Sequence, residues 1–291
     1  MTVVPQPASS GHLNRDALGA GYLPCDLLAY REALALRLDD LAGLLGIDAG
    51  KQQRRERGTR DAGMHLAGEV LAMEAFVDAV AAQEIAAITA AASPGGDDAV
   101  VLEVTADPAE FPTLYPAAVT RQDKAPYPAS LEHVAIGRAA AELLRRGYAV
   151  EVYRGDRRAD LMVLRAAAGM FKNETVNLLQ VHKGHYYRWE LDRRPPPVAA
   201  LAELRAINDF IAATAADLNI LPAGDTGVLL TYSDAEQQRF EADYPHARTL
   251  NGAAAYPARL HRIAAAHRAR IEAAAGGQVR IAQPKQIADP Q

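Results

Sequence analysis

Apolar residues recur three or four positions apart along most of the chain, and this spacing predicts an α+β protein that is mainly α-helical. The clearest helical pattern covers residues 65–92, where Leu66, Val70, Met73 and Val77 fall on one face of an α-helix. Three shorter helices are expected before it, over residues 26–36, 39–45 and 48–57.

The pattern changes after the long helix and predicts a small α/β block. Residues 100–105 are mostly Val and Leu in one short run, which favours a buried strand. A helix is expected over 128–146 and a second strand over 148–153, whereas 111–127 shows no regular spacing. The first half therefore predicts a helical block followed by a strand, a helix and a strand.

The second half predicts the same order of elements. Residues 155–158, Gly-Asp-Arg-Arg, are the expected joint between the halves. The expected elements after the joint are helices over 161–169, 173–179, 183–192 and 198–217, a strand over 228–232, a helix over 257–275 and a strand over 279–282.

The two halves also resemble each other in sequence. Residues 44–56 match residues 178–190, which lie 134 positions later, and Tyr-Pro-Ala at 127–129 recurs at 256–258. Self-similarity at a fixed offset indicates tandem copies of one unit, so a single chain presents two copies of one surface, as a homodimer would. The expected segments are a flexible arm at 1–22, a helical domain at 23–92, an α/β block at 97–155, a second helical domain at 158–218, a second α/β block at 225–282 and a tail at 283–291.

Composition narrows the class of protein. The net charge of −5 over 291 residues argues against bulk affinity for nucleic acid, although a phosphate backbone responds to a local basic patch and not to the average. The single cysteine, Cys25, excludes an internal disulfide and fits a reducing cytoplasm. We see no signal peptide and no apolar run near the roughly 20 residues that span a bilayer, so we expect a cytoplasmic protein without a membrane partner.

The segments with the most distinctive chemistry are two pairs of short helices, each joined by a tight turn. The second helix of each pair opens with a polar, basic face, which is typical of a helix-turn-helix. In the second copy the spacing assigns Val176, Leu179, Val181, Tyr186 and Trp189 to the core. The outward positions are Lys183, Gly184, His185, Tyr187 and Arg188.

The run Arg188-Trp189-Glu190, together with the later Tyr-Pro-Ala segments, resembles the phage-repressor (Xre-type) helix-turn-helix family. More narrowly, the chain resembles the YdiL-like and anti-CRISPR-associated autoregulator group, in which such a domain precedes a small α/β dimerisation block. The resemblance covers most of residues 26–155 and 160–282. It implies two structural ion pairs between the first helix and the end of the recognition helix, Arg31 with Glu56 and Arg165 with Glu190.

The first copy departs from the pattern of the second. Gln52 stands where the second copy has Tyr186, and Arg55 stands where it has Trp189. Polar residues at core-facing positions cost stability unless their stems pack and their ends reach water. Either this copy has shifted toward gripping phosphates, or it is a degenerate copy kept for packing; we favour the first, because degeneration alone does not accumulate arginine.

We therefore expect a sequence-specific DNA-binding transcriptional regulator, a repressor or autoregulator from a bacterium, phage or mobile element. The two α/β blocks are expected to pair within the chain, so that it acts as a pseudo-dimer on an imperfect inverted repeat, with its recognition helices about 34 Å apart. The residues expected to face the groove are Lys51, Gln53, Arg54, Lys183, His185, Tyr187 and Arg188. Those expected to contact phosphates are Arg37, Arg57, Arg60, Lys172, Arg193 and Arg194.

Other interpretations stay open. The chain could instead be a protein-binding module, such as an antitoxin or an inhibitor of a host factor, and RNA is an alternative nucleic-acid partner. Further homodimerisation is also open.

No Gly-rich phosphate loop, Ser-His-Asp arrangement or nucleophile elbow supports an enzyme, and we expect no cofactor. His182 and His185 lack nearby Cys or carboxylate ligands, so we expect no metal site.

Overall fold

The computed structural model describes residues 23–60, 63–96, 98–223 and 225–284. It is an α+β protein, mostly helical, with two small three-stranded sheets. The expected arm at 1–22 and the tail from residue 285 onward lie outside the described residues.

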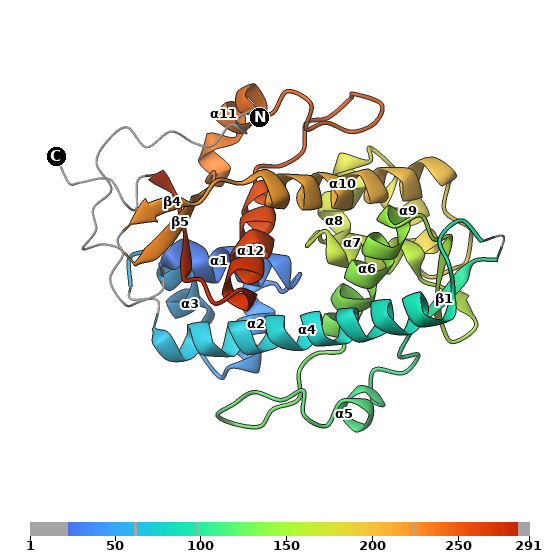
Figure 1. Ribbon diagram of the computed structural model, residues 1–291, viewed down its shortest axis with the longest axis horizontal. Helices are drawn as coiled ribbons and strands as arrows, with labels where there is room; N and C mark the ends of the chain where they lie inside the picture. Colours follow the sequence, from blue (N-terminus) through green and yellow to red (C-terminus); the bar gives the residue numbers. More distant parts are fainter. Residues whose placement is uncertain (1–22, 61–62, 97, 224, 285–291) are drawn as a thin grey trace. The chain divides into compact units, whose positions relative to one another are not determined.

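The elements of the first half follow the expected order, which can be followed by colour in Figure 1. One helix, α5, lies in a segment that shows no regular spacing in the sequence. The elements are α1 (Pro24–Ala33), α2 (Leu38–Leu44), α3 (Ala49–Glu56), α4 (Met64–Ala91), β1 (Val100–Val104), α5 (Phe111–Leu114), α6 (Ser130–Arg145) and β2 (Val150–Arg154).

The second half repeats that order with additions. The strands β3 and β4 and the helix α11 were not expected from the sequence. The elements are β3 (Arg157–Arg158), α7 (Asp160–Ala167), α8 (Lys172–Leu178), α9 (Lys183–Glu190), α10 (Val198–Asp217), β4 (Leu221–Ala223), β5 (Thr226–Leu230), a 3-10 turn (Asp234–Glu236), α11 (Gln237–Asp243), α12 (Arg259–Ala274) and β6 (Val279–Ala282).

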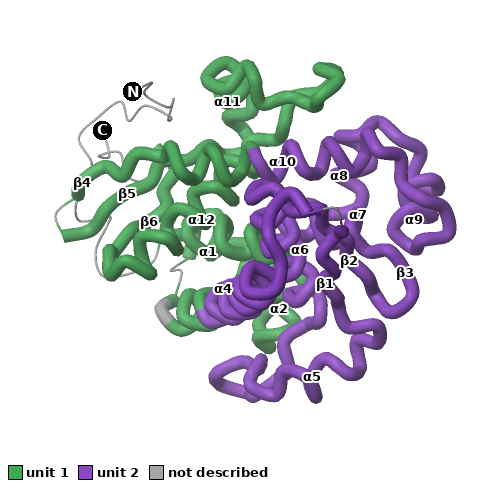
Figure 2. The backbone as a smooth tube through the Cα atoms, turned by 45° about the vertical axis from the view of Figure 1, so that its right-hand side comes forward, with its two compact units in different colours: residues 1–71, 210–291 green, residues 72–209 purple. Residues whose placement is uncertain are grey.

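The compact units of the structure do not coincide with the two halves of the sequence. Unit 1 comprises residues 1–71 and 210–291, and unit 2 comprises residues 72–209 (Figure 2). Unit 1 therefore combines α1–α3 with the second sheet and α12, whereas unit 2 combines the first sheet and α6 with α7–α9. The expectation that each half packs as one helical block with its own α/β block is wrong, because packing partners are set by tertiary contacts and not by sequence order.

Unit 2 shows why the expected joint at 155–158 is not a linker. β1 pairs with β2 in parallel, and β2 then turns back through a two-residue hairpin to pair with β3. Gly155, with φ of 62°, supplies the left-handed residue that such a hairpin requires. The chain passes directly from β3 into α7, which packs against α6. β1 alternates in burial and leaves Val101 48% exposed, so the expected fully buried strand is half-buried.

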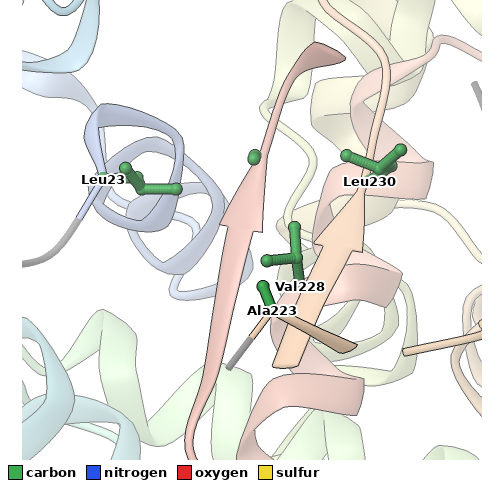
Figure 3. Packing of buried hydrophobic residues seen from close by; sticks show 5 residues of the cluster. Leu23, Ala223, Val228 and Leu230 are labelled. Atoms are coloured by element: carbon green, nitrogen blue, oxygen red, sulfur yellow. The ribbon is translucent and has the colours of Figure 1, made fainter. Parts of the chain in front are cut away.

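Unit 1 has the corresponding sheet, in which β5 pairs with β6 in parallel and with β4 in antiparallel fashion. Its strands bury Val228, Leu230 and Ala282 against Leu23, the residue that precedes α1 (Figure 3). A second cluster joins α1 to the start of α4 through Leu27 and Leu66. The helical segment and the sheet of this unit thus share a core although they are far apart in the sequence.

A hydrogen bond of the same kind ties a short helix to a strand in each unit. In unit 2, Asp160 Oδ1 accepts from the backbone N–H of Val152, eight residues away, at 3.1 Å. In unit 1, Asp26 Oδ1 accepts from the backbone N–H of Ile281, 255 residues away, at 2.7 Å. In each unit the first short helix is therefore tied to the last parallel strand of the sheet, once through a local connection and once through a distant one.

The α6–α7 contact of unit 2 predicts a large effect of a single methyl group. A Cβ at Gly137 would lie 2.0 Å from the carbonyl oxygen of Val163 in α7, and backbone cannot yield as a side-chain end can. Gly137→Ala should lower the free energy of unfolding by about 1–3 kcal/mol or more, measured by urea denaturation.

The matched control is Gly43→Ala in α2, where an added Cβ meets no atom within 4 Å. Alanine is the better helix former, so this variant should be unchanged or more stable by up to about 1 kcal/mol. Equal stabilities of the two variants would mean that α6 and α7 do not pack this closely.

Candidate nucleic-acid interface

Helices α3 and α9 begin in the same way. Each follows a tight turn with a left-handed residue, Gly46 at φ 62° and Gln180 at φ 53°. Each also has a side-chain N-cap: Asp48 Oδ1 accepts from the N–H of Lys51 at 2.8 Å, and His182 Nδ1 accepts from the N–H of Gly184 at 3.1 Å. Glycine adopts positive φ freely, whereas glutamine does so at a cost in energy. The second turn therefore stores more backbone strain than the first.

In unit 1 a buried ion pair fixes the C-terminal end of α3 to α1. Arg31 donates from Nε and Nη2 to the two carboxylate oxygens of Glu56, at 2.7 and 2.8 Å. Its Nη1 donates to the carbonyl of Leu36 at 2.8 Å, in the loop after α1. The neighbouring Glu56 raises the pKa of Arg31 against the lowering effect of burial. One guanidinium thus holds the first helix, its loop and the third helix together.

Unit 2 contains the corresponding pair with one more cation. Arg165 donates to Glu190 from Nε and to the carbonyl of Met170 from Nη1. Lys172 Nζ lies 2.7 Å from Glu190 Oε2, and Tyr186 donates its hydroxyl to Glu190 Oε1 at 3.1 Å. Both ion pairs that the family resemblance implies are therefore present. Lys172, which we expected to contact phosphate, instead has its ammonium on Glu190.

These neighbours set the ionisation of Glu190. Burial alone would raise the pKa of its carboxyl, but Arg165 and Lys172 outweigh burial and hold that pKa below its ordinary value. The carboxylate is therefore charged at neutral pH. Burial also raises the pKa of Tyr186, so its hydroxyl stays protonated and remains a donor.

The buried amide of Gln52 makes one hydrogen bond inside unit 1. Gln52 is fully buried, and its Nε2 donates to Glu56 Oε1 at 2.8 Å. It therefore takes the place of the Tyr186 hydroxyl, which reaches Glu190 from the same position one turn earlier in its helix. The amide end of Gln52 does not reach solvent, because the carboxylate it bonds lies inside the unit. Arg55 is half-buried.

The outward face of α3 and the residues after it carry free cationic groups. Lys51, Gln53 and Arg54 on α3 are exposed, as are Arg57 and Arg60 beyond its end. Among the residues that the structure describes, the guanidinium groups of Arg54, Arg57 and Arg60 make no ion pair or hydrogen bond. Arg37, at the N-cap of α2, is also exposed.

The outward face of α9 is more mixed in chemistry. Lys183, His185 and Arg188 are exposed, and so are Arg193 and Arg194 after the helix. Tyr187 is half-buried, with the ammonium groups of Lys172 and Lys183 at 5.2 and 5.5 Å from its ring centre, a cation–π distance. Of the expected core positions Val176, Tyr186 and Trp189 are buried, whereas Leu179 and Val181 are only partly so.

Two contacts at the site were missed from the sequence. Lys172, the first residue of α8, was assigned to phosphate from its charge alone. Nothing in the sequence spacing indicates that it pairs with Glu190. The Gln52–Glu56 hydrogen bond could have been predicted, because residues four apart on a helix are neighbours.

Across the described ranges no group of three or more His, Cys, Asp or Glu side chains is placed to hold a metal ion.

Comparison with protein-family models, curated proteins and solved structures finds no match. Among the described helices none is both long and apolar enough to cross a lipid bilayer.

The buried pair predicts a pH-dependent stability. Glu190→Gln should lower the free energy of unfolding at neutral pH by about 3–5 kcal/mol, because Arg165 is left buried without its partner charge. The pKa of Glu190 in the folded chain lies below its ordinary value of 4.5, so its contribution is complete above that pH and is lost as pH falls through the folded pKa. The gap between wild type and variant should therefore narrow in acid, measured by denaturation monitored with circular dichroism.

The control for that measurement is Glu151→Gln, which removes a more exposed partner of Arg158 and should cost at most about 1 kcal/mol. A Glu190→Gln variant as stable as this control, or one whose deficit stays constant in acid, would contradict the role given to the pair.

Proposed function

We propose that the protein is a DNA-binding transcriptional regulator, a repressor or autoregulator, that contacts duplex DNA with α3 and α9 as the recognition helices of two helix-turn-helix segments. One observation carries the proposal: each helix is fixed from behind by a buried Arg–Glu pair and presents cationic side chains to solvent in front. A rigid helix with outward donors suits a major groove, which admits one helix.

Charge supports the proposal despite the acidic average. Lys51, Arg54 and Arg57 follow one another within seven residues of α3 and its end, and their charges are exposed. Exposed cations that neutralise phosphates release counterions, and this release supplies affinity independent of sequence. The net charge of −5 describes the whole chain and does not oppose attraction at this surface.

The two helices are proposed to contribute differently. The α3 surface is almost purely cationic and suits phosphate contacts, which give affinity without base discrimination. The α9 surface adds His185, Tyr187 and Arg188, which offer hydrogen-bond donors and an aromatic ring for base edges. We therefore propose an imperfect inverted repeat as the target, bound by one chain as a pseudo-dimer.

The first test of the proposal is binding to random duplex at low and high salt in a gel-shift assay. Salt-sensitive binding by the wild-type chain, saturating at one chain per short duplex, is the expected result. An absence of binding at low salt would favour a protein-binding module, and complete displacement of the duplex by structured RNA would favour RNA as the partner.

Arg188→Ala should relax base preference. In selection from a random duplex pool, the variant should lose discrimination at one or two positions, with a cost of about 1–3 kcal/mol for the preferred site. Arg205→Ala, at an exposed position on α10, is the control and should select the same site as wild type. An unchanged selected motif for Arg188→Ala would remove this residue from base contact.

Arg57→Ala should weaken binding to all sequences alike. Its affinity should fall for selected and random duplexes by the same factor, and the slope of log K against log salt should become shallower by about one unit. A variant that loses affinity only for the selected duplex, or keeps the full salt slope, would contradict a phosphate contact.

A further inference from the structure

Unit 2 contains a cavity beside the C-terminal end of α9. Its volume is about 320 Å³, and its lining residues come from the β2–β3 hairpin, the start of α7, the residue Ala106 and the end of α9 at Glu190 and Leu191. Ligand pockets commonly start near 300 Å³, so the space is sufficient for a small metabolite.

Three arginines of the hairpin line this cavity, and they differ in how they are engaged. Arg158 is neutralised, because Nε donates to Asp160 and Nη1 to Glu151, each at 2.8 Å. Arg154 donates from Nε and Nη2 to the carbonyl of Ala106, at 3.1 and 3.0 Å. Within the described part of the chain the guanidinium of Arg154 thus has a neutral acceptor and no carboxylate partner.

Arg157 is the most accessible of the three. Its side chain is 66% exposed and lies 3.9 Å from Asp156, whose own side chain is 97% exposed. Such an exposed pair constrains neither group strongly. The guanidinium of Arg157 is therefore available at the rim of the cavity, while Arg154 is held in its wall.

Two carboxylates line the same cavity, that of Asp156 beside Arg157 and that of Glu190. Glu190 is already engaged by Arg165, Lys172 and Tyr186. Burial lowers the pKa of His133, and Arg154 and Arg165 lower it further, to about 4, against the weaker opposing effect of Glu190. The three arginines that line the cavity outnumber its two carboxylates.

We propose that this cavity binds a phosphate group, carried by a small metabolite or by a nucleic-acid backbone, between Arg154 and Arg157. The planar fork of a guanidinium matches phosphate oxygens, and here one guanidinium is held by the carbonyl of Ala106 while the other is exposed to solvent. All residues that line the site belong to unit 2.

Titration calorimetry of the full chain without nucleic acid tests the free ligand, with inorganic phosphate and adenosine monophosphate as probes. Both Arg154→Met and Arg157→Met should weaken binding at least tenfold, whereas Arg205→Met, on α10, should bind as wild type does. Because Arg157 is exposed, its variant keeps the fold even if Arg154→Met is unstable, and circular dichroism verifies this.

A second experiment with short duplex DNA distinguishes a phosphate on a small metabolite from a phosphate of a nucleic-acid backbone. If the small probes do not bind but duplex affinity falls in Arg157→Met and not in Arg205→Met, the site holds a backbone phosphate. The proposal is overturned if neither probe nor duplex binding responds to Arg157→Met. The calorimetric titration contains no nucleic acid, so its outcome does not depend on the DNA-binding proposal.

Discussion

The buried pair between an arginine of the first short helix and the glutamate that closes the third is the interaction on which each helical segment depends. Arg31 with Glu56 and Arg165 with Glu190 each join two helices and the carbonyl of the loop between them. Burying two charges costs several kcal/mol of hydration for each ion, which only good geometry and further hydrogen bonds offset. The additional bonds from Gln52 and Tyr186 supply that compensation in their respective units.

This arrangement also explains how the outward faces remain available. Because Glu56 and Glu190 are satisfied from inside the unit, they do not neutralise the exposed cations on the same helices. The copies differ in that Lys172 also binds Glu190, whereas Leu38 opens α2 in the first copy. The buried cluster at Glu190 therefore contains one cation more than the cluster at Glu56.

Segments with a clear hydrophobic pattern were predicted best from the sequence. The expected bounds of α10 and β6 agree with the structure, and both ion pairs that the family resemblance implies are present. The short elements β3, β4, α5 and α11 were missed, because they lie in segments that show no regular hydrophobic spacing. The composition of the compact units was not predictable, since the contact between Asp26 and Ile281 links positions whose sequence shows no sign of pairing.

The central claim is that α3 and α9 of one chain contact the same duplex. Hydroxyl-radical footprinting of the chain on a selected duplex tests it most directly. The account predicts two protected segments about one helical turn apart, one lost when Lys51 and Arg54 are replaced and the other when Lys183 and Arg188 are replaced. A single protected segment that is insensitive to one of these pairs, or uniform protection that neither pair alters, would contradict it.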